Sequence, residues 1–321
     1  MQGWRPGATP QVLRLRARLL AQVRAFFAAR GVLEVETPLL AQATVTDVHL
    51  ASLATTLAGR PRPFYLQTSP EYAMKRLLAA GSGDIFQVCK AFRDGESGRH
   101  HNPEFTLIEW YRLGFDHVRL MDEVEALLTL LLGPRLRQPA ERLSYRGAFE
   151  RVLGLDPASA PTAELATLAV RRLGAPAGGF GADRDALLDL LMGALVSPEL
   201  GQERITFVDA YPASQAALAR LLPGSPPVAA RFEAYVAGLE LCNGFQELGD
   251  AAEQRARFEA DLGVRAARGL PAVPLDERLL AALSAGLPDC AGVAVGFDRI
   301  VMLAGGLEAL QQALGFAVDD A

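Results

Sequence analysis

The sequence predicts an α+β fold in which an antiparallel β-sheet is flanked by helices. Three observations lead to this prediction: an amphipathic segment opens the chain, two strand-like segments flank a highly charged loop, and a strand running into a helix closes it. With 321 residues, half of them hydrophobic, the chain can bury a large core. We expect a single domain over residues 1–321, with a mostly helical elaboration at about 116–204.

Charge and composition limit the classes of function. A net charge of −5 argues against a nucleic-acid backbone as the main partner, so any site for a polyanion would be local. The three cysteines include no C-x-x-C pair, which speaks against a zinc site and a disulfide framework. The N-terminus lacks the apolar core of a signal peptide and no apolar run could span a membrane, so a cytoplasmic protein without membrane contact is expected.

The first elements follow from periodicity and capping signals. Apolar residues from Val12 to Phe26 recur at helical spacing, and Gly31 ends that helix. Ser69 followed by Pro70 predicts the start of a second helix, which Gly81 closes. The predicted strands are 32–38, 64–68, 84–92, 104–115, 205–212, a hairpin within 230–248, and the segment that begins at Gly292.

The segment 92–112 holds three Arg, two His and four carboxylates between apolar strands. A solvated hairpin tip would need only a few of these charges, so an anion site is the alternative. Strand alternation places Phe105, Leu107, Glu109 and Tyr111 on one face of the returning strand. Taken alone, this pattern is also that of an amphipathic strand with Glu109 in solvent.

Two further strands carry candidate site residues. A hairpin turning at Ala237-Gly238 would put Glu233 opposite Cys242 and diagonal to Glu240, and such paired carboxylates suit Mg²⁺ on phosphates. Glu247 would join their face only if a bulge lay near Asn243-Gly244.

On the last strand, Gly292, Ala294 and Gly296 share one face. This pattern indicates either close approach of a ligand or tight strand–helix packing. We expect Asp298 to be the N-cap of the following helix.

These segments resemble the ordered motifs of class II aminoacyl-tRNA synthetases. "RGVLEVETPLL" resembles motif 1, "FRDGESGRHHNPEF" motif 2 and "GVAVGFDRI" motif 3, while "TSPEY", "HNPEFTLIEWY" and "LELCNGFQEL" are similar to the lysyl branch. The resemblance runs from about residue 12 to the C-terminus. It implies the class II fold, in which motif 1 usually forms a homodimer interface.

The resemblance also implies roles for individual residues, with ATP and Mg²⁺ as cofactors. Arg93 and Arg299 would be catalytic, and Glu233 and Glu240 would hold the metal. The ATP site would comprise Arg93, Asp94, Gly95, Glu96, His101, Asn102, Phe105, Glu240, Leu241, Asn243, Gly296 and Arg299, with Phe105 and Arg299 sandwiching the adenine. A lysine-like substrate would contact Ser69, Glu71, Glu109, Tyr111, Phe245, Glu247 and Ala294.

The sequence departs from the lysyl pattern at two positions. The family has Glu at the second position after the motif 2 Arg, where this chain has Gly95, and the carboxylate follows as Glu96. In motif 3 the chain has Ala294 where Gly is usual. One added methyl can shift substrate preference by ~1–3 kcal/mol, which is enough to favour a β-amino over an α-amino acid.

Only about a dozen residues precede the first helix, so the anticodon-binding domain of lysyl-tRNA synthetases has no counterpart here. Free-standing catalytic domains of this kind attach lysine or β-lysine to a lysine of translation elongation factor P. That resemblance implies elongation factor P, rather than tRNA, as the acceptor. Two alternatives stay open: a reduced synthetase that charges tRNA or another small RNA, and a non-catalytic regulatory paralogue that binds an amino acid. An asparagine synthetase on the same fold fits poorly, because its substrate carries a carboxylate.

Overall fold

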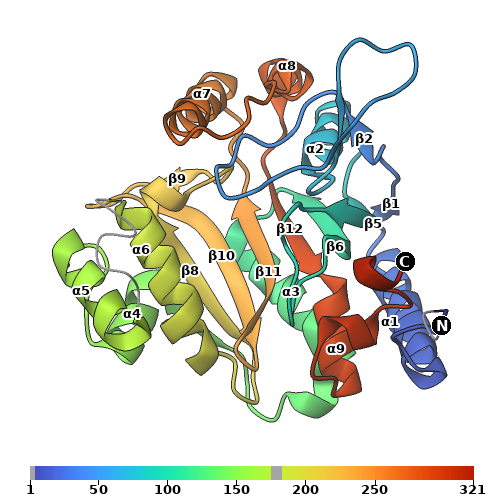
Figure 1. The fold of residues 1–321 in the computed structure, drawn as a ribbon, viewed down its shortest axis with the longest axis horizontal. Helices are drawn as coiled ribbons and strands as arrows, with labels where there is room; N and C mark the ends of the chain where they lie inside the picture. Colours follow the sequence, from blue (N-terminus) through green and yellow to red (C-terminus); the bar gives the residue numbers. More distant parts are fainter. Residues whose placement is uncertain (1–3, 175–182) are drawn as a thin grey trace.

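A nine-stranded sheet forms the centre of the computed structural model, which describes residues 4–174 and 183–321 (Figure 1). Its strands in spatial order are β1 (Leu33–Glu34), β5 (Ile85–Phe92), β6 (Glu104–Leu113), β12 (Cys290–Gly296), β11 (Leu239–Gln246), β10 (Val228–Val236), β8 (Thr206–Pro212) and β7 (Glu141–Ser144), with β9 (Leu221–Leu222) on β10. Only the β1–β5 and β7–β8 pairs are parallel. The predicted α+β fold with a mainly antiparallel sheet flanked by helices is therefore confirmed.

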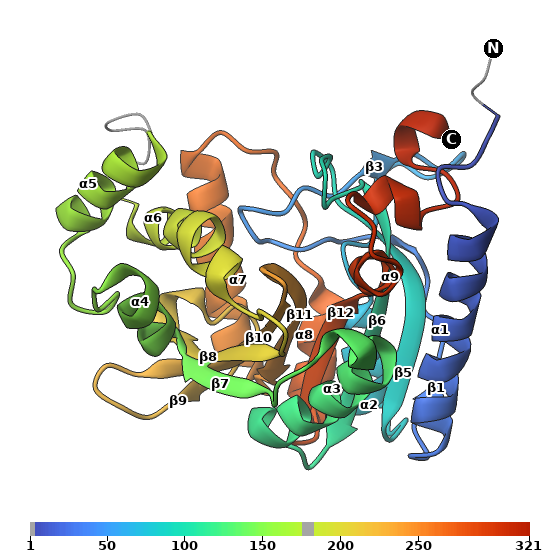
Figure 2. The same cartoon turned by 90° about the horizontal axis from the view of Figure 1, so that it is seen from below.

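The helices follow the predicted order along the chain. They are α1 (Pro10–Ala28), α2 (Glu71–Ala79), α3 (His117–Leu132), α4 (Tyr145–Leu153), α5 (Thr162–Leu173), α6 (Arg184–Leu191), α7 (Ala251–Ala267), α8 (Glu277–Gly286) and α9 (Phe297–Gly305). The helices α4, α5 and α6 lie beside β7 and β8, at the end of the molecule opposite α1 (Figure 2). The range 116–204 holds α3, α4, α5 and α6 and also contributes the edge strand β7, although α3 packs in the main core.

The two faces of the sheet have different environments because side chains alternate along each strand. Ile108 and Trp110 of β6 and Val293 and Val295 of β12 belong to one buried cluster with residues of α1, α3 and α9. Glu109, Tyr111 and the glycines of β12 therefore lie on the other face. The face assignment predicted for 104–112 is correct, but Glu109 is only 2% exposed, so the reading that left it in solvent is wrong.

The hairpin of β10 and β11 turns at Ala237 and Gly238, whose φ values of 52° and 76° are those of a two-residue primed turn. The register differs from our prediction, since Glu233 pairs with Asn243 and Cys242 pairs with Ala234. Leu241 is the extra residue, because Tyr235 pairs with Glu240. This bulge lies before the predicted one at Asn243-Gly244, and it places Glu233, Glu240 and Glu247 on one face.

Several short elements differ in extent from the expected ones. The strand predicted at 32–38 is reduced to β1, and the segment at 64–68 contributes β4 (Phe64–Leu66) to a separate sheet with β2 (Leu40–Ala41) and β3 (Ala54–Thr55). Asp298 is not an N-cap. It lies inside the first turn of α9, where its carboxylate accepts from the Thr106 N–H and forms an ion pair with Arg16 at 2.5 Å.

Across the described residues, no helix is both long and apolar enough to cross a membrane.

Candidate active site

A cluster of mostly acidic, largely buried side chains, which we call the acidic pocket, lies on the face of the sheet that bears Glu109 and comprises Glu71, Lys75, Glu109, Tyr111 and Glu247. The ammonium group of Lys75 lies 2.7 Å from Glu71 Oε1 and 2.6 Å from Glu247 Oε2, and the residue is 1% exposed. The Tyr111 hydroxyl donates to Glu109 Oε1 at 2.8 Å. Glu109 Oε2 is buried without a hydrogen-bond partner among residues 4–174 and 183–321. The pocket therefore keeps one acceptor oxygen free.

The pocket depends on the absence of a side chain at Gly292. A Cβ there would lie 2.2 Å from the Tyr111 ring and 2.6 Å from Glu247 Oε1. In the sheet, Gly292 pairs with Tyr111 on one side and with Phe245 on the other. At Gly292 the space is filled by the side chains of Tyr111 on β6 and of Glu247 after β11, so the strand–helix packing expected for these glycines is not what this position shows.

Burial governs the protonation of the pocket. It raises the pKa of Glu109 well above the usual value, and the nearby carboxylate of Glu71 adds to the effect. Burial also raises the pKa of Glu247 to about 7, against the opposing effect of Lys75. Burial alone would lower the pKa of Lys75, but Glu247 and Glu71 outweigh it and the net shift is upward. A positively charged ligand would favour the ionised carboxylates.

Arg93 follows the last residue of β5 and begins the charged loop. Its guanidinium lies 5.0 Å from the centroid of the Phe105 ring and 3.4 Å from Glu96 Oε1. Its Nε is buried and has no hydrogen-bond partner within the described chain. The loop thus directs a carboxylate to Arg93 from position 96, one residue later than the family pattern, while Gly95 adopts the left-handed conformation with φ 78°.

Arg299 of α9 joins the loop to β11. Its Nη1 donates to the Glu240 carbonyl oxygen at 2.6 Å, and its Nη2 lies 2.8 Å from His101 Nε2. Partial burial and the charge of Arg299 lower the pKa of His101, so a neutral imidazole faces the guanidinium at pH 7. Arg299 and His101, both predicted to contact ATP, are brought together.

Glu233 and Glu240 occupy the centre of this face. Glu233 accepts from Arg231 Nη2 at 2.6 Å and from the Tyr235 hydroxyl. Arg231 Nε donates to Asn243 Oδ1 at 3.2 Å, across the β10–β11 pair. Burial, followed by the charge of Glu233, raises the pKa of Glu240 to about 7.

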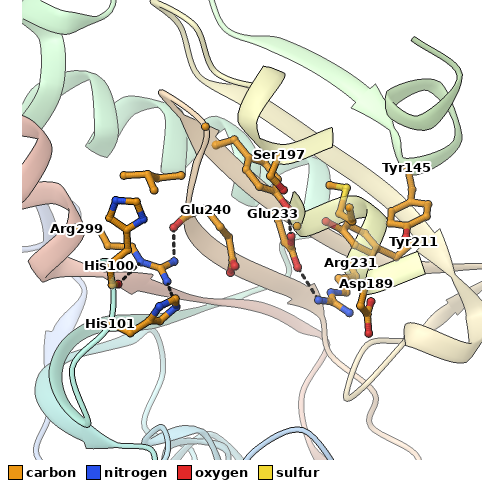
Figure 3. Close-up of a pocket in the computed structure, with 15 residues that line it drawn as sticks. His100, His101, Tyr145, Asp189, Ser197, Tyr211, Arg231, Glu233, Glu240 and Arg299 are labelled. Atoms are coloured by element: carbon orange, nitrogen blue, oxygen red, sulfur yellow. Dashed lines mark hydrogen bonds and ion pairs between the residues drawn. The ribbon is translucent and has the colours of Figure 1, made fainter. Parts of the chain in front are cut away.

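A cavity of ≈ 340 Å³ opens along these residues. Figure 3 shows Arg299, His100, His101 and Glu240 at one end, and Tyr145, Tyr211, Asp189 and Arg231 at the other, with Glu233 between them. Of the predicted nucleotide site, His101, Glu240 and Arg299 line the first end, whereas Arg93 and Phe105 do not line the cavity. The second end lies against the helical elaboration and was not predicted.

The other predicted residues have mixed surroundings. Asn102 is 5% exposed, donates to the Glu104 carbonyl at 2.5 Å and accepts from the Val318 N–H at 3.1 Å, so its amide holds the backbone. The Ser69 hydroxyl accepts from the Glu71 N–H at 3.4 Å, at the start of α2.

Leu241 is buried in the core cluster, and Phe245 packs toward the helical elaboration. Asp94 donates its N–H to the Ala51 carbonyl, and Gly296 lies within van der Waals reach of Arg299. Ala294 lies between Glu109 and Asn243 in the sheet.

Sequence reasoning missed Lys75 and Arg231. Lys75 is one of only two lysines in the chain, and it stands four residues after Glu71 in a predicted helix, which was an available signal. Arg231 precedes Glu233 by two residues on one strand, so alternation could have paired them.

The fold and this constellation of carboxylates and arginines define a class of protein. The model of the family "tRNA synthetases class II (D, K and N)" matches residues 3–320, so the chain belongs to that family. Proteins named elongation factor P–(R)-beta-lysine ligase in Klebsiella pneumoniae subsp. pneumoniae and in Salmonella paratyphi B are each 52% identical to it over 322 residues. The alignment covers 99% of this chain and 98% of each relative.

Proposed function

We propose that this chain is an ATP-dependent ligase that activates (R)-β-lysine, or lysine, as an aminoacyl-adenylate and transfers it to the ε-amino group of a lysine on elongation factor P. The observation that carries the proposal is the acidic pocket, which shares its face of the sheet with Glu233, Glu240 and a cavity lined by Arg231 and Arg299. The printed name of its relatives agrees with this chemistry.

Recognition of a diamino acid follows from the charges of the acidic pocket. Three carboxylates and one ammonium leave a charge of −2 when all are ionised, and two substrate ammonium groups neutralise it. The free Glu109 Oε2 and the oxygens around Lys75 are the acceptors for these groups. A substrate with a carboxylate side chain would add negative charge to a buried acidic site and be rejected.

In the first step, a carboxylate oxygen of the amino acid attacks the α-phosphorus of ATP. The new P–O bond forms as the bond to pyrophosphate breaks. Arg93, whose buried Nε lacks a partner, would hold the α-phosphate and the substrate carboxylate with its planar set of donors. Arg299 and Phe105 would hold the adenine. Orientation and charge neutralisation then supply the catalysis without an acid or base.

Magnesium fits this site as a partner of the phosphates. Mg²⁺ in nucleotide sites needs only one or two protein carboxylates, because phosphates and water complete its shell. Glu240 has no side-chain partner in the described chain, and burial, followed by the charge of Glu233, raises its pKa to about 7, whereas Glu233 already pairs with Arg231. Glu233 and Glu240 would hold the ion, which neutralises phosphate charge when bound.

In the second step, the neutral ε-amine of the acceptor attacks the carbonyl carbon of the adenylate. A C–N bond forms, the C–O bond to phosphate breaks and AMP leaves. One proton is lost from the acceptor ammonium before attack and another from the nitrogen afterwards.

Three further parts of the proposal concern the whole protein: residues 1–321 form a single domain, the protein works as a homodimer through its motif 1 region, and it acts in the cytoplasm. Exposed leucines at positions 13, 33, 39 and 40 give that region the apolar surface that a dimer interface requires. Light scattering that returns twice the chain mass of 34.3 kDa would support the dimer.

Exchange of labelled pyrophosphate into ATP tests the proposed activation step. We expect exchange that depends on (R)-β-lysine or lysine and that Glu247→Ala abolishes while the protein stays folded by circular dichroism. Exchange without any amino acid dependence, or none at all, contradicts the proposal and favours a non-catalytic paralogue.

A further inference from the structure

The cavity extends past Glu233 into a second compartment that the activation step does not use. We call it the insert compartment, and it is lined by Tyr145 of α4, Asp189 of α6, Met192, Ser197, Tyr211 of β8 and Arg231. Asp189 is exposed at its mouth, whereas Tyr145 and Tyr211 are 1% and 2% exposed. Figure 3 shows Tyr145, Tyr211, Asp189 and Arg231 on the side of Glu233 away from Arg299.

A buried hydroxyl in the insert compartment lacks a partner. The Tyr145 hydroxyl is buried and makes no hydrogen bond within residues 4–174 and 183–321, whereas the Tyr211 hydroxyl lies close to Glu233 and Tyr235. Their rings lie 4.8 Å apart between centroids. Leaving a buried hydroxyl unpaired is costly, so such groups indicate a missing ligand or water.

The charges of the insert compartment favour a single cation. Arg231 is already satisfied, because it donates to Glu233, to Asn243 and, at 2.8 Å, to the Gln215 carbonyl. Glu233 offsets its charge, and the other cationic group that acts on Asp189 is the His49 side chain. Asp189 Oδ1 accepts from Gln215 Nε2 at 2.8 Å, and no side-chain donor of the described chain reaches its other oxygen. Asp189 is exposed as a whole residue, but the protein atoms around its carboxyl group desolvate it and raise its pKa to about 6, so the carboxylate is mainly ionised at pH 7.

The insert compartment is continuous with the site of activation. Glu233 pairs with Asn243, Asn243 with Ala294, and Ala294 with Glu109, so one row of side chains crosses the sheet from the compartment to the acidic pocket. Adjacent strands are ~4.8 Å apart. An extended alkyl chain that passes Asp189 and Glu233 therefore approaches the carbonyl of an amino acid bound at Ala294.

We propose that the insert compartment is the entry site for the acceptor, in which Asp189 binds the ε-ammonium group of the incoming lysine and the Tyr145 hydroxyl helps to orient it. This inference rests on the proposed function and assigns the transfer step to residues outside the activation site. A primary ammonium is a three-donor cation, and a carboxylate with phenolic oxygens supplies its acceptors. Asp189 is a positioning residue in this scheme, since attack follows once the amine has moved inward.

The test separates the two half-reactions in Asp189→Asn and Tyr145→Phe. For Asp189→Asn we expect kcat/KM for transfer to elongation factor P to fall about tenfold or more, with pyrophosphate exchange within twofold of wild type. Tyr145→Phe removes an unpaired hydroxyl and leaves the ring packing intact, so a smaller loss of transfer is expected without loss of folding. Hydroxylamine, a neutral nucleophile, should capture the activated amino acid equally well in all variants.

Asp185→Asn is the matched control. Asp185 lies one turn earlier on α6 and accepts from the Ser214 hydroxyl at 2.8 Å, outside the insert compartment. It should leave transfer unchanged. Wild-type transfer in Asp189→Asn, or an equal loss of exchange and transfer, overturns the inference. A wild-type protein without exchange or transfer would instead contradict the proposed function.

Discussion

The buried ammonium group of Lys75 neutralises part of the negative charge of the acidic pocket, so removing it should destabilise the folded protein. It contacts two carboxylates from different elements, Glu71 on α2 and Glu247 just after β11. The compact ammonium can reach both with single donors, whereas the planar fork of an arginine would need more room.

Replacing Lys75 by Met should lower the free energy of unfolding by about 3–5 kcal/mol, because two buried carboxylates lose their cation. Urea denaturation at pH 8 measures this change. Lys90→Met is the control, since Lys90 pairs with Glu104 at the surface, at 3.1 Å, and should cost no more than ~1 kcal/mol. Equal effects of the two substitutions would contradict the role of Lys75.

The pKa of Glu247 predicts a pH dependence of amino acid activation. Glu247 faces Lys75, Glu71 and Glu109, and its folded pKa of about 7 lies above the ordinary value of 4.5. Without ligand, this group makes the folded state less stable as pH rises from 4.5 through 7, because the folded form holds its proton longer.

Binding of a substrate ammonium requires the ionised form of Glu247, so activity follows the opposite trend. In a pyrophosphate exchange profile, kcat/KM for the amino acid should rise between pH 6 and pH 8. In Glu247→Gln the residual activity should lose that rise. A flat wild-type profile would show that Glu247 does not bind the ammonium group.

Among the predicted site residues, Arg93 should have the largest effect on the rate of adenylate formation. Arg93→Ala removes the donors for the charge that develops on the α-phosphate, and exchange should fall by ~10²–10³. Arg99 is a suitable comparison in the same loop, because it donates to the Glu308 carbonyl at 2.8 Å, whereas Arg93 lies over the Phe105 ring. Arg99→Ala should lower exchange far less, and equal losses would mean that the loop conformation, rather than Arg93, limits the rate.

At the scale of elements, the bulge at Leu241 determines which side chains of β11 lie on the face of the sheet that carries the site. Residues 240 and 243 would point to opposite faces in a regular strand, but the extra residue puts Glu240 on the face of Asn243. Strict alternation put Glu247 on the opposite face, and only a bulge near Asn243-Gly244 was expected to bring it round. The position of the bulge could not be predicted, since it depends on pairing with both neighbouring strands.

The strand β12 leaves room for the side chains of Tyr111 and Glu247 because Gly292 has no side chain. Gly292→Ala would force a methyl to within 2.2 Å of the Tyr111 ring, so we expect the KM for the amino acid to rise at least tenfold and the melting temperature to drop. Gly263→Ala in α7, where a Cβ meets nothing within 4 Å, is the control and should be neutral or slightly stabilising. A Gly292→Ala protein with normal KM would contradict the packing account.

At the scale of the whole molecule, local patterns predicted the main strands, most helices and the face on which Glu109 and Tyr111 lie. They predicted less of what depends on distant contacts, such as the separate β2–β4–β3 sheet and the pairing of Lys75 with Glu247. The insert compartment was also missed, because α4, α6 and β8 come together only in the folded chain. The resemblance to class II synthetases indicated which ligand each site residue would contact, and the residues alone had left this open.

The central claim is that the activated amino acid is passed to a protein. The most direct measurement is the intact mass of elongation factor P after incubation with this protein, ATP, Mg²⁺ and each lysine isomer. We predict one added lysyl unit on one lysine side chain, with (R)-β-lysine preferred and tRNA left uncharged. Unmodified elongation factor P with both isomers, together with robust charging of lysine tRNA, would contradict the account.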